Sequence, residues 1–130
     1  MTTTSKLKHI DDLHFEHQLW TSEAKFYVDE LKIYQKRLAE VASKNTKEDV
    51  RKQVEHFQNQ FSIQKEQLDI LSHRVNEHEE WLAKYATNHP VAIDHKLFPD
   101  HESMHEKMDT FRKIYSELKK EFNHFLSIWM

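Results

Sequence analysis

Residues 10–43, IDDLHFEHQLWTSEAKFYVDELKIYQKRLAEVAS, decide the fold because their apolar side chains recur every three or four positions. This spacing places those side chains on one face of an α-helix, which is then buried against partner helices. Residues 50–85 and 101–129 carry the same spacing. The sequence therefore predicts an all-α fold, an antiparallel bundle of three long helices.

The composition favours the same fold class. The chain has 130 residues with no glycine and two prolines, whereas β-hairpins rely on glycine in their turns. We expect a disordered tail at residues 1–8 and a single helical-bundle domain at residues 9–130. Thr46 and Asp100 have the side chains of N-caps for the second and third helices. The expected helices span about 10–43, 46–86 and 100–129.

The first two helices mirror each other in sequence. Positions whose numbers sum to 95 carry matching side chains, such as Leu38 with Phe57 and His17 with His78. A tight hairpin would place these pairs at the same level, since short connections favour antiparallel neighbours. The third helix would then return beside the first, which brings His101 at its start to the level of the other two histidines.

One histidine interrupts each apolar face, so three helices deliver an imidazole to one layer of the predicted bundle. Nine of the 11 histidines are expected at this end. His101 and His105 are four residues apart, so both side chains leave one helix face and can bind the same ion. Glu77 adjoins His78 and is expected to be partly buried. The candidate metal ligands are His17, His78, His101 and His105, followed by His14 and Glu77.

Imidazole nitrogen, with or without carboxylate, suits Zn²⁺ and Fe²⁺ best among the candidates, with Cu²⁺ and Ni²⁺ as further choices. The chain has no cysteine, which excludes thiolate ligands. Met104 and Met108 occupy ordinary apolar positions, so we expect them in the core rather than on copper. The common nucleophile and nucleotide-binding motifs are absent. An enzyme of this sequence would therefore have to use the metal.

The order of the histidine motifs resembles that of hemerythrin-like proteins, the HHE cation-binding bundles. Those proteins carry a histidine early in the first helix, H-x-x-x-E late in the second and H-x-x-x-H early in the third. The matching residues here are His14 or His17, then His73 with Glu77, then His101 with His105. This resemblance implies a non-haem di-iron centre that binds or senses dioxygen. The heptad pattern itself turns His73 outward, and the three-helix architecture is also similar to spectrin-like modules, which imply no metal.

A second apolar stripe lies away from the predicted core. We expect its residues to merge into one patch on the outer side of the hairpin and to form a homodimer interface. The stripe consists of Leu19, Phe26, Ile33, Ile63 and Ile70.

Other partners are not expected. The net charge is −3 and no basic face is present, which argues against nucleic acid. No apolar run approaches the roughly 20 residues that span a bilayer. The N-terminus lacks an apolar signal segment, so we expect a cytoplasmic protein.

Two classes of function follow from this pattern. The first is a transition-metal-binding bundle that senses or stores metal or dioxygen, or uses the metal in chemistry. The second is a structural or interaction module without metal, whose histidines act as a pH switch because histidine titrates near pH 6.5.

Overall fold

The computed structural model describes residues 10–88 and 97–130, with side chains described for 11–84 and 101–130. It contains three helices: α2 (Ile10–Lys44), α3 (Glu48–Asn88) and α4 (Leu97–Trp129). No strand occurs within these ranges. The prediction of an all-α fold with three long helices is therefore confirmed for the described part of the chain. At 1.5 Å per residue the helices are about 50–60 Å long.

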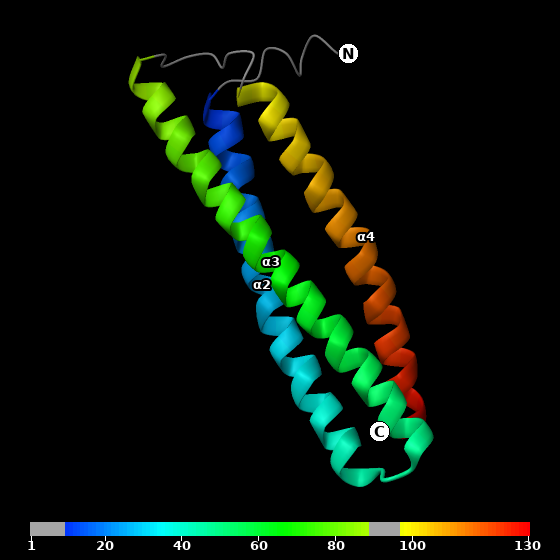
Figure 1. Ribbon diagram of the computed structural model, residues 1–130. Helices are drawn as coiled ribbons and strands as arrows, with labels where there is room; N and C mark the ends of the chain where they lie inside the picture. The colour runs from blue at the N-terminus through cyan, green and yellow to red at the C-terminus, as the bar shows by residue number, and fades with distance from the viewer. Residues whose placement is uncertain (1–9, 89–96) are drawn as a thin grey trace.

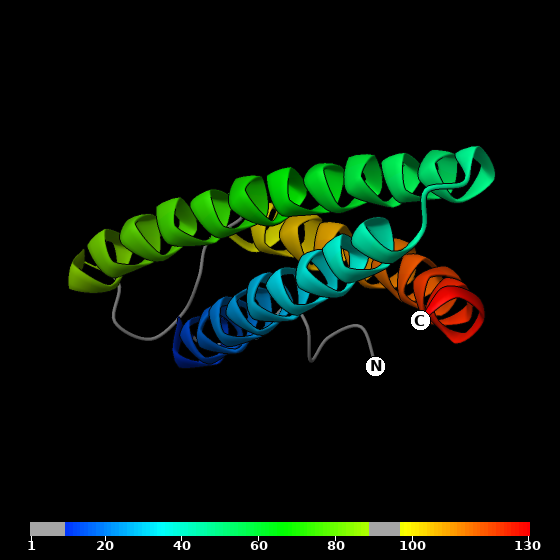
Figure 2. The ribbon, with the colours of Figure 1, turned by 90° about the horizontal axis from the view of Figure 1, so that it is seen from below.

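The three helices pack side by side as a bundle (Figure 1). The chain turns between α2 and α3, and α3 returns along α2. The C-terminus of α4 lies at the same end of the bundle as this turn (Figures 1 and 2). Two pairs of the predicted register are in contact. The ring centroids of His17 and His78 are 5.3 Å apart, and those of Tyr34 and Phe61 are 6.0 Å apart.

The core is a continuous aromatic and aliphatic cluster drawn from the predicted apolar faces. Phe57 of α3 contacts Phe122 and Phe125 of α4, with ring centroids 5.2 and 5.0 Å apart. Met104 and Met108 are buried in the same cluster, as expected. The cluster covers most of the bundle length and ends next to the histidine layer.

Two helices begin at other residues than predicted. The Lys47 carbonyl accepts a hydrogen bond from the Arg51 amide at 3.1 Å, so Lys47, and not Thr46, directly precedes α3. Helix α4 begins at Leu97, which places Asp100 inside the first turn instead of at the cap. Pro99 is compatible with this turn, because the first amide groups of a helix have no acceptor within the helix.

Carboxylates at a seven-residue spacing join α2 to α4. Glu23 accepts hydrogen bonds of 2.6 and 2.8 Å from Arg112, and Glu30 accepts one of 3.0 Å from Lys119. Glu16, one heptad earlier, accepts a hydrogen bond of 2.8 Å from His101. The side of α2 that carries these glutamates is therefore the side that faces α4.

The predicted merger of the apolar stripes is wrong. Leu19, Phe26 and Ile33 are 51–59% exposed. Each follows one of the three glutamates by three residues, which places them beside the edge that faces α4. Ile63 and Ile70 instead line a groove between α3 and α4 that no α2 residue lines. The two stripes therefore lie on different faces of the bundle.

Several expectations concern residues outside the described ranges. These are the tail at 1–8 and three of the histidines assigned to the histidine-rich end: His9, His89 and His95. No helix within the described ranges is long and apolar enough to cross a membrane.

Candidate metal centre

Each helix places one histidine in the same buried layer. His17 is 2% exposed, His78 9% and His101 0%. One possible ligand nitrogen from each ring lies within 4.8 Å of those of the other two. The layer arises because the hairpin register pairs His17 with His78, while the first turns of α4 bring His101 alongside α2.

The rings of this layer contact one another directly. Ring centroids are 5.2 Å apart for His17 and His101, and 6.0 Å apart for His78 and His101. His17 Nε2 and His78 Nδ1 lie within hydrogen-bond distance of each other, at 3.3 Å. Three imidazoles from three helices therefore lie in mutual contact.

Glu79 holds His17 from the surface side of the layer. Its Oε1 accepts a hydrogen bond from His17 Nδ1 at 2.8 Å, and its Oε2 accepts one from His14 Nδ1 at 2.5 Å. Burial raises the pKa of the Glu79 carboxyl, but the hydrogen bonds from His17 and His14 outweigh burial and bring the pKa below its ordinary value. Glu79 is therefore an anion near neutral pH, and a neutral His17 that donates from Nδ1 would carry its lone pair on Nε2, which faces His78.

Glu16 has the same relation to His101. Its Oε1 accepts the 2.8 Å hydrogen bond from His101 Nε2, and its Oε2 lies 3.8 Å from His105 Nε2. A neutral His101 that donates from Nε2 carries its lone pair on Nδ1. Carboxylates that orient the far nitrogen of a histidine in this way are characteristic of metal-binding histidines.

Apolar side chains shield the layer from above and below. Trp20 is 4% exposed and stacks on His101 with ring centroids 4.9 Å apart. Leu13 and Leu82, one turn beyond His17 and His78 toward the end of the bundle, are 0% and 1% exposed. Such surroundings lower the local dielectric constant and strengthen any interaction with a charge in the layer.

The structure brings together three of the six predicted ligands. His105 and His14 are 42% and 50% exposed and border the layer through Glu16 and Glu79. Glu77 is 65% exposed and pairs with His73 at 3.4 Å, so the expectation that Glu77 is partly buried is wrong. The position next to His78 that does face the layer is Glu79.

Sequence reasoning missed Glu79, although a signal for it was present. The hairpin register pairs positions whose numbers sum to 95, and the numbers of His17 and Glu79 sum to 96. Glu79 is therefore expected within one residue of the level of His17. Glu77 and Glu79 both neighbour His78, and only the side on which α2 packs distinguishes them.

Comparisons with protein-family models, with curated proteins and with solved structures found no match for this chain. The site itself offers three imidazole nitrogens in a buried layer with two carboxylates behind them. Neutral imidazoles are good ligands for a divalent transition metal, and two carboxylates balance its two positive charges.

Proposed function

We propose that this protein binds a divalent transition metal, with His17, His78 and His101 as ligands. The observation that carries the proposal is the convergence of three buried ligand nitrogens, one from each helix, within 4.8 Å. Glu79 and Glu16 orient His17 and His101, and they supply the negative charge that a buried cation requires. His105 and His14 are exposed enough to supply a further ligand from the rim.

Zinc suits this donor set best. Two nitrogens bound to zinc at about 2.0–2.1 Å in tetrahedral geometry lie about 3.3 Å apart. His17 Nε2 and His78 Nδ1 are separated by 3.3 Å, a distance that matches this geometry and also allows a hydrogen bond between the two rings when no metal is bound. A site with three histidines leaves a fourth position for water, a rim histidine or another small ligand. Fe²⁺ takes the same donors, with Cu²⁺ and Ni²⁺ as further candidates.

Metal storage, sensing of metal or dioxygen, and metal-dependent chemistry all begin with this binding step. The hemerythrin-like resemblance predicts a di-iron centre in which His73 and Glu77 take part. In the proposed site these two residues have no role, because they pair with each other on the exposed face. Elemental analysis of protein purified without an affinity tag decides between one zinc and two irons per chain.

The experiment that tests metal binding is thermal unfolding with and without metal. Metal that binds only the folded state at 100 times its Kd adds about 2.7 kcal/mol, which is roughly 10 °C in melting temperature for a domain of this size. We expect Zn²⁺ to raise the melting temperature of wild-type protein, a chelator to reverse the rise, and His101→Ala to abolish it.

His124→Ala is the matched control, because His124 is exposed at the far end of α4. We expect this variant to respond to Zn²⁺ as the wild type does. An equal response in both variants would show that metal binds nonspecifically to histidines on the surface. Absence of any response in the wild type would favour the second class of function, an interaction module whose histidines titrate with pH.

The antiparallel packing of the bundle and its assembly into a homodimer belong to this proposal as well. The packing is supported by the contacts of His17 with His78 and of Tyr34 with Phe61. For the dimer we propose the α2 stripe alone, Leu19, Phe26 and Ile33, because a single two-fold interface does not cover this stripe and the groove of Ile63 and Ile70 together.

A further inference from the structure

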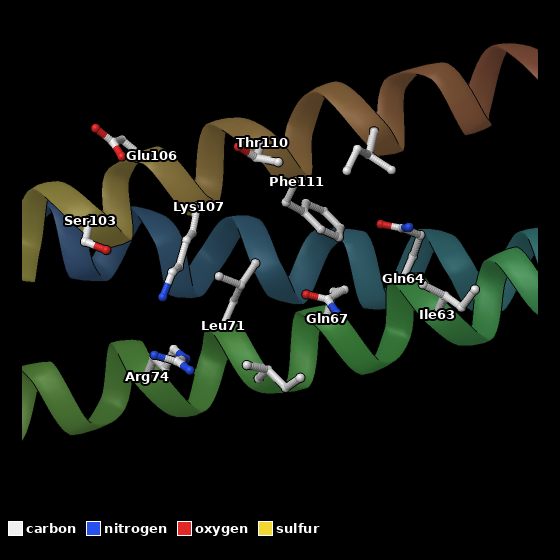
Figure 3. Close-up of a pocket in the computed structure, with 12 residues that line it drawn as sticks. Ile63, Gln64, Gln67, Leu71, Arg74, Ser103, Glu106, Lys107, Thr110 and Phe111 are labelled. Carbon is white, nitrogen blue, oxygen red and sulfur yellow. The ribbon is translucent and has the colours of Figure 1, made fainter.

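A groove of about 660 Å³ runs between α3 and α4, and no residue of α2 lines it (Figure 3). Its most buried lining residues are Leu71, Phe111 and Gln64, which are 6%, 4% and 4% exposed, so the floor is mostly apolar with one amide. Three isoleucines border it, Ile63 and Ile70 from α3 and Ile114 from α4, and they are 40–50% exposed. Large apolar side chains left in water along a groove are typical of a binding site.

The groove is basic at one end only. Lys107 extends from α4 toward α3, and Arg74 lies opposite it on α3 (Figure 3). Within the described part of the chain, neither cation has a carboxylate oxygen within 4.0 Å. Glu106 borders the groove but points away from it (Figure 3). A ligand with a single anionic head and an apolar body matches this distribution of charge.

The basic end is the end nearest the histidine layer. A smaller cavity of about 270 Å³ shares Arg74, Ser103 and Lys107 with the groove, and its other lining residues are Glu77, His78, Trp81 and Met104. From Arg74 back to Ile63 the groove follows α3 over 11 residue steps, about 16 Å at the rise of an α-helix. This length suits an extended aliphatic chain rather than a compact anion.

We propose that the groove binds a medium-chain aliphatic carboxylate, of the fatty-acid class. The carboxylate lies between Arg74 and Lys107 and takes charge-assisted hydrogen bonds from both, bidentate from the guanidinium. The chain lies on Leu71 and Phe111 and removes the three isoleucines from water. The head then lies at the outer side of the histidine layer, next to His78. The groove residues do not overlap the three proposed metal ligands, so each site can be tested without the other.

The experiment is a calorimetric titration of the chelator-treated 130-residue protein with dodecanoate, below its micellar concentration. We expect saturable binding of one molecule per chain. Arg74→Gln combined with Lys107→Gln should weaken it roughly ten- to a hundredfold, since hydrogen bonds to a charged group are lost. Decanoate should bind more weakly, by at most about fourfold for each methylene removed from the groove.

The control variant combines Lys52→Gln with Lys113→Gln, which removes the same charge from exposed positions outside the groove. It should bind dodecanoate as the wild type does. Equal affinity for dodecyltrimethylammonium, or equal loss in both double variants, would overturn the proposal. So would binding to anionic phospholipid vesicles without binding of monomeric dodecanoate, which would assign the groove to a membrane surface. Because metal is absent throughout, failure here leaves the melting experiment with Zn²⁺ unaffected.

Discussion

At the scale of single residues, the two glutamates that flank His78 have opposite environments. Glu79 is 32% exposed and hydrogen-bonded to His17, whereas Glu77 is 65% exposed and paired only on the surface with His73. They are two residues apart, which is roughly 200° around a helix. One therefore faces α2 and the other faces away. The site gains an orienting carboxylate from this turn of the helix, and it would lose it if α2 packed on the other side of α3.

This difference predicts unequal effects of two conservative substitutions. Glu79→Gln keeps the shape of the side chain but removes the charge that orients His17, so we expect metal affinity to fall roughly 10–100-fold. Glu77→Gln should leave the affinity within a factor of two or so of the wild type, since its effect is that of an exposed pair. Competition titration with a chromophoric zinc chelator measures both. An equal loss of metal affinity in the two variants would show that Glu79 does not orient a metal ligand.

At the scale of the helices, three glutamates one heptad apart fix how α4 lies against α2. Glu23 and Glu30 bind Arg112 and Lys119, and Glu16 binds His101. The hydrogen bond from Arg112 lowers the pKa of Glu23 more than burial raises it. The row of glutamates that binds Arg112 and Lys119 therefore also positions His101 of the site.

The lowered pKa of Glu23 predicts how the stability depends on acid. Its folded pKa lies below the ordinary 4.5, so the stabilisation is complete above pH 4.5 and is lost as pH falls through the folded value. At pH 7, Glu23→Gln should cost about 1 kcal/mol, since the pair with Arg112 is partly exposed. Urea unfolding from pH 7 to pH 3 should show the two proteins converging at low pH. A constant difference would contradict the assignment.

Tyr27 predicts a second change at high pH. Burial, followed by its hydrogen bond to Glu23, raises the pKa of Tyr27 from 10.0 to about 12. The unfolded chain therefore loses this proton first, and the stability that Tyr27 contributes below pH 10 is lost as pH rises toward 12. Tyr27→Phe should show a shallower fall in the free energy of unfolding across this range. If its curve runs parallel to that of the wild type, the hydroxyl is not held as described.

At the scale of the whole molecule, the sequence predicts which residues lie at the same level of the bundle better than it predicts which face of the hairpin α4 covers. The spacing of apolar residues predicts the three helices, and the mirrored register places His17 beside His78, because both depend only on helix periodicity. Neither one states on which side of the hairpin α4 packs. Glu79 and the groove beside Ile70 depend on that choice, so they became visible only in the folded arrangement. The start of α4 differs from the predicted one for a local reason, since Pro99 fits within a first turn as well as before it.

The exposed apolar stripe of α2 predicts that two copies of the protein assemble through this helix. Leu19, Phe26 and Ile33 are seven residues apart and remain 51–59% exposed, a seam typical of helix pairing. A two-fold axis near Phe26 would place Phe26 against its copy, and Leu19 against Ile33 of the partner subunit, so one stripe serves as both halves of the interface. The groove between α3 and α4 stays open in such a dimer, which makes assembly and carboxylate binding compatible.

Phe26→Glu should convert the dimer to a monomer, because two carboxylates would meet at the centre of a dehydrated interface. Ile128→Glu is the matched control, since Ile128 is 58% exposed near the end of α4 and lies off the stripe. Sedimentation velocity at tens of micromolar protein distinguishes the two species. We expect Ile128→Glu to sediment with the wild type and Phe26→Glu to sediment more slowly. A wild type that is already monomeric at this concentration would refute the dimer, and the α2 stripe would then be a solvated surface of the bundle.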